Sequence, residues 1–243
     1  KKAGFQPFKL KTKLFGVNGY FKKGNNTSEP TIYIEGDGFA WIDKYTISRN
    51  PTPRNPLALR LASIDSSDTV FYLPRPCQYV DMLQEKNCSQ NYWTNARFSS
   101  EVIDSFDQAL VLIKNEINAN GFHLVGFSGG GAVATLLAEK RNDIKSLRTI
   151  AGNLDHVSLN IYKKVSPLSG SLNPMNLAPE IKHIPQIHFT GSDDKVVPSW
   201  VAKNFVKATG KGSCASAHSV MNAEHMDGWL IPWKYLHRQK ISC

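Results

Sequence analysis

The sequence predicts an α/β fold in which helices cover both faces of a mostly parallel central sheet. Short apolar runs alternate with longer helical patterns along the chain, which is typical of a parallel sheet covered by helices. The chain has 243 residues, of which 41% are hydrophobic and 20% are charged, so it can bury a sizeable core. No internal repeat, low-complexity tract or linker divides it, and we therefore expect a single domain over residues 1–243.

The first half of the chain contains three predicted strands and two predicted helices. The clearest helix covers residues 99–118, because Val102, Phe106 and Ile113 recur at helical spacing and Ser99 or Ser100 can cap it. A shorter helical pattern lies within residues 55–65. Apolar runs predict strands at residues 13–17 (KLFGV), 31–36 (TIYIEG) and 68–74 (DTVFYLP).

The second half continues the alternation. A strand is predicted at residues 122–127 and a helix rich in small residues at 130–140, followed by buried strands at 147–152 and 185–191. Residues 155–183 carry Pro and Ser and have weak periodicity, so we expect a short lid-like connection there.

The predicted turn between residues 127 and 130 carries the first functional signal. Gly126-Phe127-Ser128-Gly129-Gly130 fits the G-x-S-x-G pattern between a strand and a helix, a context in which a tight turn exposes the serine hydroxyl. Ser128 is therefore a candidate nucleophile. The Gly129 N–H, at the start of the next helix, is a candidate oxyanion donor. The alternative is a glycine-rich turn that only serves helix packing.

A serine nucleophile needs a base, and the base needs an acid that fixes its tautomer. In chains with this pattern the acid follows the serine and the histidine comes last. Asp193 and Asp194 follow the predicted strand at 185–191. We favour Asp194, because D-x-V-V-P leaves the valines to pack and turns the carboxylate into the loop, and we keep Asp193 as the alternative.

Three histidines lie downstream of these carboxylates. His225 stands in a polar loop just before the last predicted helix, where its ring can reach Ser128. His218 falls in a predicted strand and His237 on the terminal helix. We therefore predict His225 as the base.

The loop after the strand at 31–36 is the expected source of a second oxyanion donor. Gly36 and Gly38 allow the backbone to turn its N–H groups inward, and we expect the Asp37 N–H to be the donor. Glu35 stands where a histidine is usual in the HGGG-type motif. A simple β-turn built from E-G-D-G is the alternative.

Four cysteines, Cys77, Cys88, Cys214 and Cys243, form no C-x-x-C pair, so we expect no metal site and no cofactor. Their even number and the short separation of Cys77 from Cys88 favour two disulfides in an oxidising compartment. We favour Cys77–Cys88 with Cys214–Cys243, although four cysteines permit three pairings and reduced thiols are the alternative.

With the serine pattern, the later acid and the last histidine in order, the chain from about residue 30 to 237 resembles an α/β-hydrolase. The segments YIEGDGFAW, PTPRNPLALRLA, RPCQYV and NYWTNARFS are similar to a group of bacterial exported, lipoprotein-like α/β-hydrolases whose activities are largely uncharacterised. The resemblance implies Ser128, Asp194 and His225 as a triad, and a Cys77–Cys88 bridge. It also implies a periplasmic or cell-envelope location after removal of a signal peptide, with a lipid anchor on a missing N-terminus as one form.

The charge balance bears on partners. Lys and Arg outnumber Asp and Glu by 29 to 20, and seven lysines fall within the first 23 residues. A basic surface of this kind can bind an anionic membrane. The alternative is that it is only a solvated basic face without a partner. No motif typical of nucleic-acid binding accompanies it, so we expect no nucleic-acid partner.

The expected activity is hydrolysis of a small-molecule or lipid carboxylester through an acyl-enzyme. Trp41, Tyr92, Trp93 and Phe127 are candidates for an acyl pocket, although aromatic residues more often serve the core. Two alternatives stay open. One is a serine peptidase, and the other is a binding protein that keeps the fold without catalysis.

Overall fold

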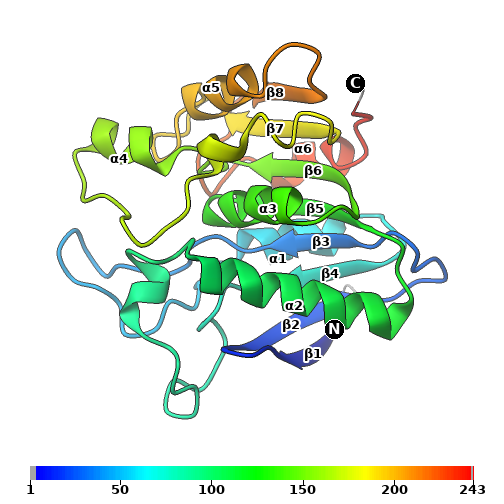
Figure 1. The fold of residues 1–243 in the computed structure, drawn as a ribbon, viewed down its shortest axis with the longest axis vertical. Helices are drawn as coiled ribbons and strands as arrows, with labels where there is room; N and C mark the ends of the chain where they lie inside the picture. The colour runs from blue at the N-terminus through cyan, green and yellow to red at the C-terminus, as the bar shows by residue number, and fades with distance from the viewer. Residues whose placement is uncertain (1–3, 242) are drawn as a thin grey trace.

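A computed structural model describes residues 4–241 and 243. Its centre is one eight-stranded sheet with the order β1-β2-β4-β3-β5-β6-β7-β8. Six neighbouring strands run parallel: β4, β3, β5, β6, β7 and β8. The other two are antiparallel, because β1 pairs antiparallel with β2 and β2 pairs antiparallel with β4. The predicted α/β fold, with a mostly parallel sheet and helices on both faces, is confirmed (Figure 1). The strand bounds are Gln6–Lys11, Gly16–Lys22, Thr31–Ile34, Val70–Leu73, Phe122–Phe127, Ile144–Ile150, Gln186–Gly191 and Ala215–Val220.

Helices cover the sheet on both sides. Figure 1 shows α2 and α3 in front of the sheet and α1 and α6 behind it. The α-helices are α1 (Leu57–Ile64), α2 (Ser100–Ile117), α3 (Gly129–Lys140), α4 (His156–Lys163), α5 (Trp200–Ala208) and α6 (Leu230–Leu236), with 3-10 turns η1 (Gln90–Trp93) and η2 (Pro174–Leu177). Among the described residues, none of these helices combines the length and the apolar composition needed to cross a bilayer.

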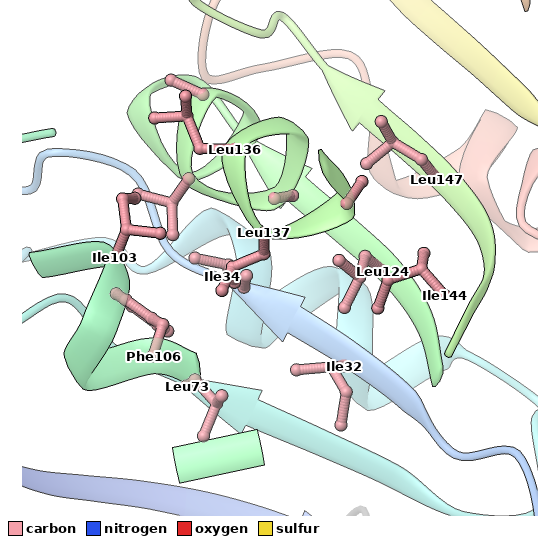
Figure 2. Close-up of a cluster of buried hydrophobic side chains, with 14 of the residues drawn as sticks. Ile32, Ile34, Leu73, Ile103, Phe106, Leu124, Leu136, Leu137, Ile144 and Leu147 are labelled. Atoms are coloured by element: carbon pink, nitrogen blue, oxygen red, sulfur yellow. The ribbon is translucent and has the colours of Figure 1, made fainter. Parts of the chain in front are cut away.

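The strand side chains alternate between two cores, as the period of two in a strand requires. Ile32 and Ile34 of β3 point toward the cluster beneath α2, α3 and α5, whereas Tyr33 joins the cluster beneath α1 and α6. Figure 2 shows the first cluster, in which Phe106 of α2 and Leu137 of α3 lie over the strands. All four residues of β3 are buried, so the central strands are fixed from both sides.

The prediction of a strand at residues 13–17 was wrong. Only residues 16 and 17 belong to a strand, and the residues before them form the turn between β1 and β2. The Phe15 backbone N–H donates to the Thr12 hydroxyl over 3.1 Å, and the Thr12 N–H donates to the Phe15 carbonyl over 3.0 Å. Side-chain closure of this kind competes with extended structure. Lys1 and Lys2, which contribute to the predicted basic N-terminus, lie outside the described residues.

The connection at residues 155–183 contains α4 and η2. Its apolar residues Leu159, Leu168 and Ile181 are buried in the first core cluster, so much of this segment is packed onto the fold. In Figure 1, α4 lies on the side to which the arrowheads of β6 and β7 point, which is the carboxyl edge of the parallel strands.

Both expected disulfides are present. Cys77 joins Cys88 and Cys214 joins Cys243, which confirms the predicted pairing. Disulfides form and persist in oxidising compartments. Two of them therefore suggest a protein that matures outside the cytoplasm.

Candidate active site

Ser128 occupies the tight turn between β5 and α3. Its backbone has φ 52° and ψ −119°, a conformation that L-residues rarely adopt and that costs about 1–3 kcal/mol. The Ser128 N–H donates to the Ile150 carbonyl over 2.9 Å, which ties the turn to β6. A side chain at Gly126 would overlap the Gly130 carbonyl, and one at Gly130 would overlap the Ile34 carbonyl. The glycines are therefore required because three backbone segments meet at this turn.

His225 and Asp194 lie beside this serine although they are far from it in sequence. Asp194 follows β7 and His225 follows β8, so parallel strands bring both to the same edge of the sheet. The His225 Nε2 lies 3.0 Å from the Ser128 Oγ, and the His225 Nδ1 lies 2.9 Å from the Asp194 Oδ2. The Asp194 side chain is fully buried and that of His225 is 15% exposed. The arrangement can pass a proton from the hydroxyl to an oriented imidazole.

Backbone groups fix the carboxylate of Asp194. The N–H groups of Val196 and Val197 donate to its Oδ1 over 2.7 Å and 2.9 Å. The other oxygen is then left to face the His225 ring. The D-x-V-V-P stretch therefore turns the carboxylate inward and supplies the two donors that hold it.

The alternative residues lie elsewhere. Asp193 is exposed and accepts a hydrogen bond from the Ser192 hydroxyl over 3.2 Å. His218 lies on β8 with its ring centroid 5.9 Å from that of Phe189. His237 contacts the Ser66 hydroxyl at 3.0 Å. None of the three is within hydrogen-bond distance of Ser128.

The loop after β3 lies against the serine turn. A side chain at Gly36 would stand 3.3 Å from the Ser128 Cβ, and one at Gly129 would overlap the Asp37 carboxylate. Within residues 4–241 and 243, the backbone N–H groups of Asp37 and Gly129 have no acceptor. Two unpaired N–H groups beside a nucleophile are what an oxyanion requires.

Arg75 and Arg97 hold this loop in place, and sequence analysis missed both. They contact opposite oxygens of Asp37, with N–O distances of 3.1 Å for Arg75 and 2.6 Å for Arg97. The Arg75 guanidinium also donates to the Arg97 carbonyl. Two arginines and one carboxylate leave one net positive charge beside the two free N–H groups. Such a charge stabilises an oxyanion.

Ionisation within the cluster follows from these contacts. Burial alone would raise the pKa of Asp37, but the guanidinium groups of Arg97 and Arg75 outweigh it and lower the pKa below its ordinary value. Burial lowers the pKa of Arg75 to about 10, so that guanidinium stays charged at neutral pH.

There was one sequence signal for the two arginines. Arg75 and Arg97 fall within two of the segments quoted for the family resemblance.

Glu35 occupies a different environment from its neighbour Asp37. It is buried, and its carboxylate accepts hydrogen bonds from the Gly36 N–H over 2.9 Å and the Tyr72 hydroxyl over 3.1 Å. Burial nevertheless dominates and raises the pKa of Glu35 to about 7. Glu35 therefore acts as a support beneath the loop and carries a proton in the folded state through mildly acidic pH.

This pKa predicts how stability depends on pH. Between the ordinary value of 4.5 and about 7, the unfolded chain loses the Glu35 proton while the folded chain keeps it. Stability from this group is thus fully present below pH 4.5 and is lost as pH rises through 7, in all about 3 kcal/mol. Glu35→Gln, which cannot ionise, should lack this loss. Urea unfolding across this pH range measures it, and parallel pH profiles of the two proteins would contradict the prediction.

A cleft of about 380 Å³ opens above the serine. It is lined by Ser128, His225, residues 37–41 and Phe127, with Arg54 and Arg97 at its sides. Of the predicted aromatic lining residues, Trp41 and Phe127 do line it. Tyr92 instead packs edge-on against Phe15 with centroids 4.8 Å apart, and Trp93 is buried in the same small core cluster. Nothing in residues 4–241 and 243 forms a group of three or more His, Cys, Asp or Glu side chains that could hold a metal ion.

Solved structures with the same fold include proteins from bacteria, archaea and fungi. The α/β-hydrolase GrgF from Penicillium has a TM-score of 0.67 and 13% identity, with 97% of this chain and 96% of that chain covered. An α/β serine hydrolase homologue from Coxiella burnetii has a TM-score of 0.64 and 14% identity, with coverage of 95% and 94%. An esterase from Pyrococcus furiosus has a TM-score of 0.64 and 12% identity, with coverage of 96% and 88%. At these identities the likeness shows the fold.

Sequence comparison supplies the family. No curated protein matches the chain. The family model described as serine hydrolase (FSH1), by contrast, matches residues 60–241. This range includes Ser128, Asp194 and His225 and covers most of the chain. The protein therefore belongs to the FSH1 family of serine hydrolases.

Proposed function

We propose that the protein is a carboxylesterase, lipase-like in its substrate, that works through an acyl-enzyme on Ser128. The observation that carries this proposal is the continuous hydrogen-bonded chain from the Ser128 Oγ through the His225 ring to the Asp194 carboxylate, with links of 3.0 Å and 2.9 Å. A serine hydroxyl is a weak nucleophile until a base takes its proton. An imidazole within hydrogen-bond distance of the Ser128 Oγ, with a carboxylate on its other nitrogen, supports these roles.

Acylation proceeds in two stages. The His225 Nε2 takes the proton of the Ser128 hydroxyl while the Oγ attacks the ester carbonyl carbon, and the carbonyl oxygen becomes an oxyanion held by the N–H groups of Gly129 and Asp37. The tetrahedral intermediate then collapses. The ester C–O bond breaks, the leaving alkoxide takes the proton from His225, and the acyl group remains on Ser128.

Deacylation repeats these steps with water. His225 takes a proton from a water molecule, whose oxygen attacks the acyl carbon, and collapse releases the carboxylic acid as the proton returns to Ser128. Asp194 keeps its negative charge throughout. It accepts from the His225 Nδ1–H, which selects the tautomer with a free Nε2 and stabilises the imidazolium that forms twice in each cycle.

The cleft supports an ester with an apolar acyl group. Phe39, Trp41 and Phe127 line it together with the reacting groups, and apolar walls with a few polar groups are typical of sites for such ligands. Structures with the same fold include an esterase and a membrane phospholipase A, which agrees with a lipid or small-molecule ester as substrate.

The two other interpretations have less support. An acylaminoacyl peptidase from Pyrococcus horikoshii shares the fold, but the match covers only 40% of that chain. A binding protein without catalysis would have no reason to keep a serine, a histidine and an acid in hydrogen-bonded order.

The disulfides and the family resemblance support an exported protein. Cys77–Cys88 and Cys214–Cys243 require oxidation during maturation. We propose a bacterial periplasm or cell envelope, where lipid esters are accessible, as the location of the enzyme.

A fluorophosphonate probe tests the reaction type, because it phosphonylates only a serine activated by a base. We expect one probe per protein, mapped by mass spectrometry to Ser128, together with hydrolysis of p-nitrophenyl esters and none of matched p-nitroanilides. If Ser128 is labelled and the p-nitroanilides are hydrolysed, the proposal of an esterase would give way to that of a peptidase. Absence of labelling on folded, disulfide-intact protein would overturn catalysis in favour of a binding role.

A further inference from the structure

Large apolar side chains are exposed beside the active-site cleft. Loop 41–47 and the segment around α4 carry several of them, including Val157 and Leu172. Six, each between 40% and 83% exposed, are hereafter the apolar rim: Trp41, Ile42, Tyr45, Ile161, Tyr162 and Val165. Figure 1 shows α4 and the light-blue loop that follows β3 on the side to which β6 and β7 point. Single exposed apolar residues are ordinary, whereas a group of them marks an interaction site.

The loop holds its part of the rim outward by local hydrogen bonds. The Ile42 N–H donates to the Thr46 carbonyl over 2.9 Å, and the Asp43 carboxylate accepts from the N–H groups of Tyr45 and Thr46 over 2.8 Å each. Trp41 and Ile47 form a β-bridge at its base. The exposed side chains therefore stand on a braced turn, which lowers the entropic cost of binding through them.

Helix α4 is apolar on two faces. Leu159 and His156 face the protein interior, as expected of a surface helix. The other side carries Ile161 and Tyr162, and Val165 follows just beyond the helix end, all exposed. Tyr162 packs edge-on against Trp200 with ring centroids 5.7 Å apart, and the Lys163 ammonium donates to the Lys195 carbonyl. Tyr162 keeps 60% of its surface exposed and Ile161 keeps 74%, so this side of α4 is only partly covered.

The rim and the catalytic cleft are continuous. Trp41 and Tyr45 from the loop and Val165 and Leu168 from the α4 segment line one cavity of about 770 Å³. Trp41 and Arg97 line both this cavity and the cleft that holds Ser128. A molecule bound at the rim therefore lies at the entrance to the nucleophile.

The charges among these side chains are mainly positive. Residues 41–49 and 157–172 contain Lys44, Arg49, Lys163 and Lys164 but a single carboxylate, Asp43. The Lys44 ammonium lies 5.5 Å from the ring centroid of Tyr45, and that of Lys163 lies 5.6 Å from the centroid of Tyr162. Aromatic rings flanked by lysines suit the boundary between lipid headgroups and acyl chains.

We propose that the apolar rim docks on an anionic phospholipid surface, with its rings among the upper acyl chains and its lysines at the headgroup phosphates. The positive charge favours this occupant over a second copy of the chain, because a symmetric dimer would bring the same lysines together. The basic N-terminal hairpin is a separate surface, and this docking face does not include it. Binding does not depend on the proposed hydrolysis, although it would deliver acyl esters to the cleft.

Vesicle flotation tests the proposal with the Ser128→Ala protein, so that no lipid is consumed. Vesicles are phosphatidylcholine alone or phosphatidylcholine mixed with phosphatidylglycerol. We expect binding to the mixed vesicles, weakening as salt is added. The double variant Tyr45→Ser/Ile161→Ser should bind at least about tenfold more weakly because its apolar area no longer inserts. Lys163→Gln/Lys164→Gln should lose about fivefold per lysine.

Matched controls come from the same chain. Tyr235 and Ile231 on α6 are each 75% exposed, so Tyr235→Ser/Ile231→Ser removes the same chemistry away from the rim. Lys9→Gln/Lys11→Gln removes two exposed lysines from β1. Both controls should bind like the parent, and all variants should melt at the same temperature because each change is at the surface.

Three results would overturn the docking. These are no flotation with either vesicle, equal loss in the rim and control variants, or a rim variant that changes the molar mass by light scattering without changing flotation. The outcomes remain separable from those of the proposed function. Reaction of the parent protein with fluorophosphonate, without flotation of Ser128→Ala, contradicts the docking alone. Flotation of Ser128→Ala, without reaction of the parent protein, contradicts the hydrolase activity alone.

Discussion

Replacing Ser128 with alanine is expected to lower kcat for an ester by about 10⁶-fold while leaving KM close to its original value. In the proposed mechanism the Ser128 hydroxyl bonds to substrate, and within residues 4–241 and 243 no other side-chain hydroxyl or thiol is within hydrogen-bond distance of His225. The cleft walls and the two free N–H groups stay in place, so ground-state binding persists. Initial rates with a p-nitrophenyl ester over a range of concentrations separate the two constants.

Ser216→Ala is the matched control for this experiment. Ser216 is exposed on β8 and lines neither the cleft nor the cavity beside it, so its removal should change neither constant. A Ser128→Ala protein that retains more than about a thousandth of the original rate would show that another nucleophile carries the reaction.

The Asp194→Asn substitution should lower kcat by about 10⁴-fold with little loss of stability. The asparagine oxygen can still accept from the N–H groups of Val196 and Val197. Its amide NH₂ would then face the His225 Nδ1, which must become the acceptor. That tautomer places the proton on Nε2, where the Ser128 hydroxyl needs a base. The loss is thus one of protonation state, which kcat measures and a thermal melt does not.

Asp193→Asn tests the same step at the neighbouring residue. Its carboxylate is exposed and accepts a hydrogen bond from the Ser192 hydroxyl, away from His225, so we expect activity near that of the parent protein. Equal losses at the two positions would instead indicate a general effect of charge near the cleft. A larger loss at Asp193 would reassign the acid.

Local sequence signals were sufficient for the centre of the fold. The sequence predicted the serine turn together with the strand before it and the helix after it. Its signal was the glycines at 126 and 130, which the structure explains by the close approach of neighbouring backbone at both positions. Asp194 and His225 could be predicted because both follow predicted parallel strands, whose carboxyl ends lie at one edge of the sheet, and because they follow the serine in the expected order. In the structure the three side chains do lie together. Their catalytic roles remain predictions.

The parts that could not be predicted depend on contacts between distant residues. Arg75 and Arg97 meet Asp37 across separations of 38 and 60 residues, and nothing near either arginine in sequence indicates this partner. The N-terminal turn was misassigned because the hydroxyl of Thr12, rather than the apolar run that follows it, decides the local backbone. Tyr92 and Trp93 had the composition of a pocket wall, but their packing against Phe15 and its neighbours places them in a core.

The disulfide between Cys214 and Cys243 also constrains the segment that carries His225. Its two cysteines are 29 positions apart in sequence, and the covalently closed loop between them contains β8, His225 and α6. Closing a loop of this length lowers the conformational entropy of the unfolded chain and so raises the free energy of unfolding by about 3–4 kcal/mol. Ser128 and Asp194 lie outside that loop, so of the three groups only His225 is held by a link that a reductant can cut. Reduction opens this loop and removes that contribution to stability, so the reduced protein is expected to unfold at a lower urea concentration and to lose the contact between His225 and Ser128 with it.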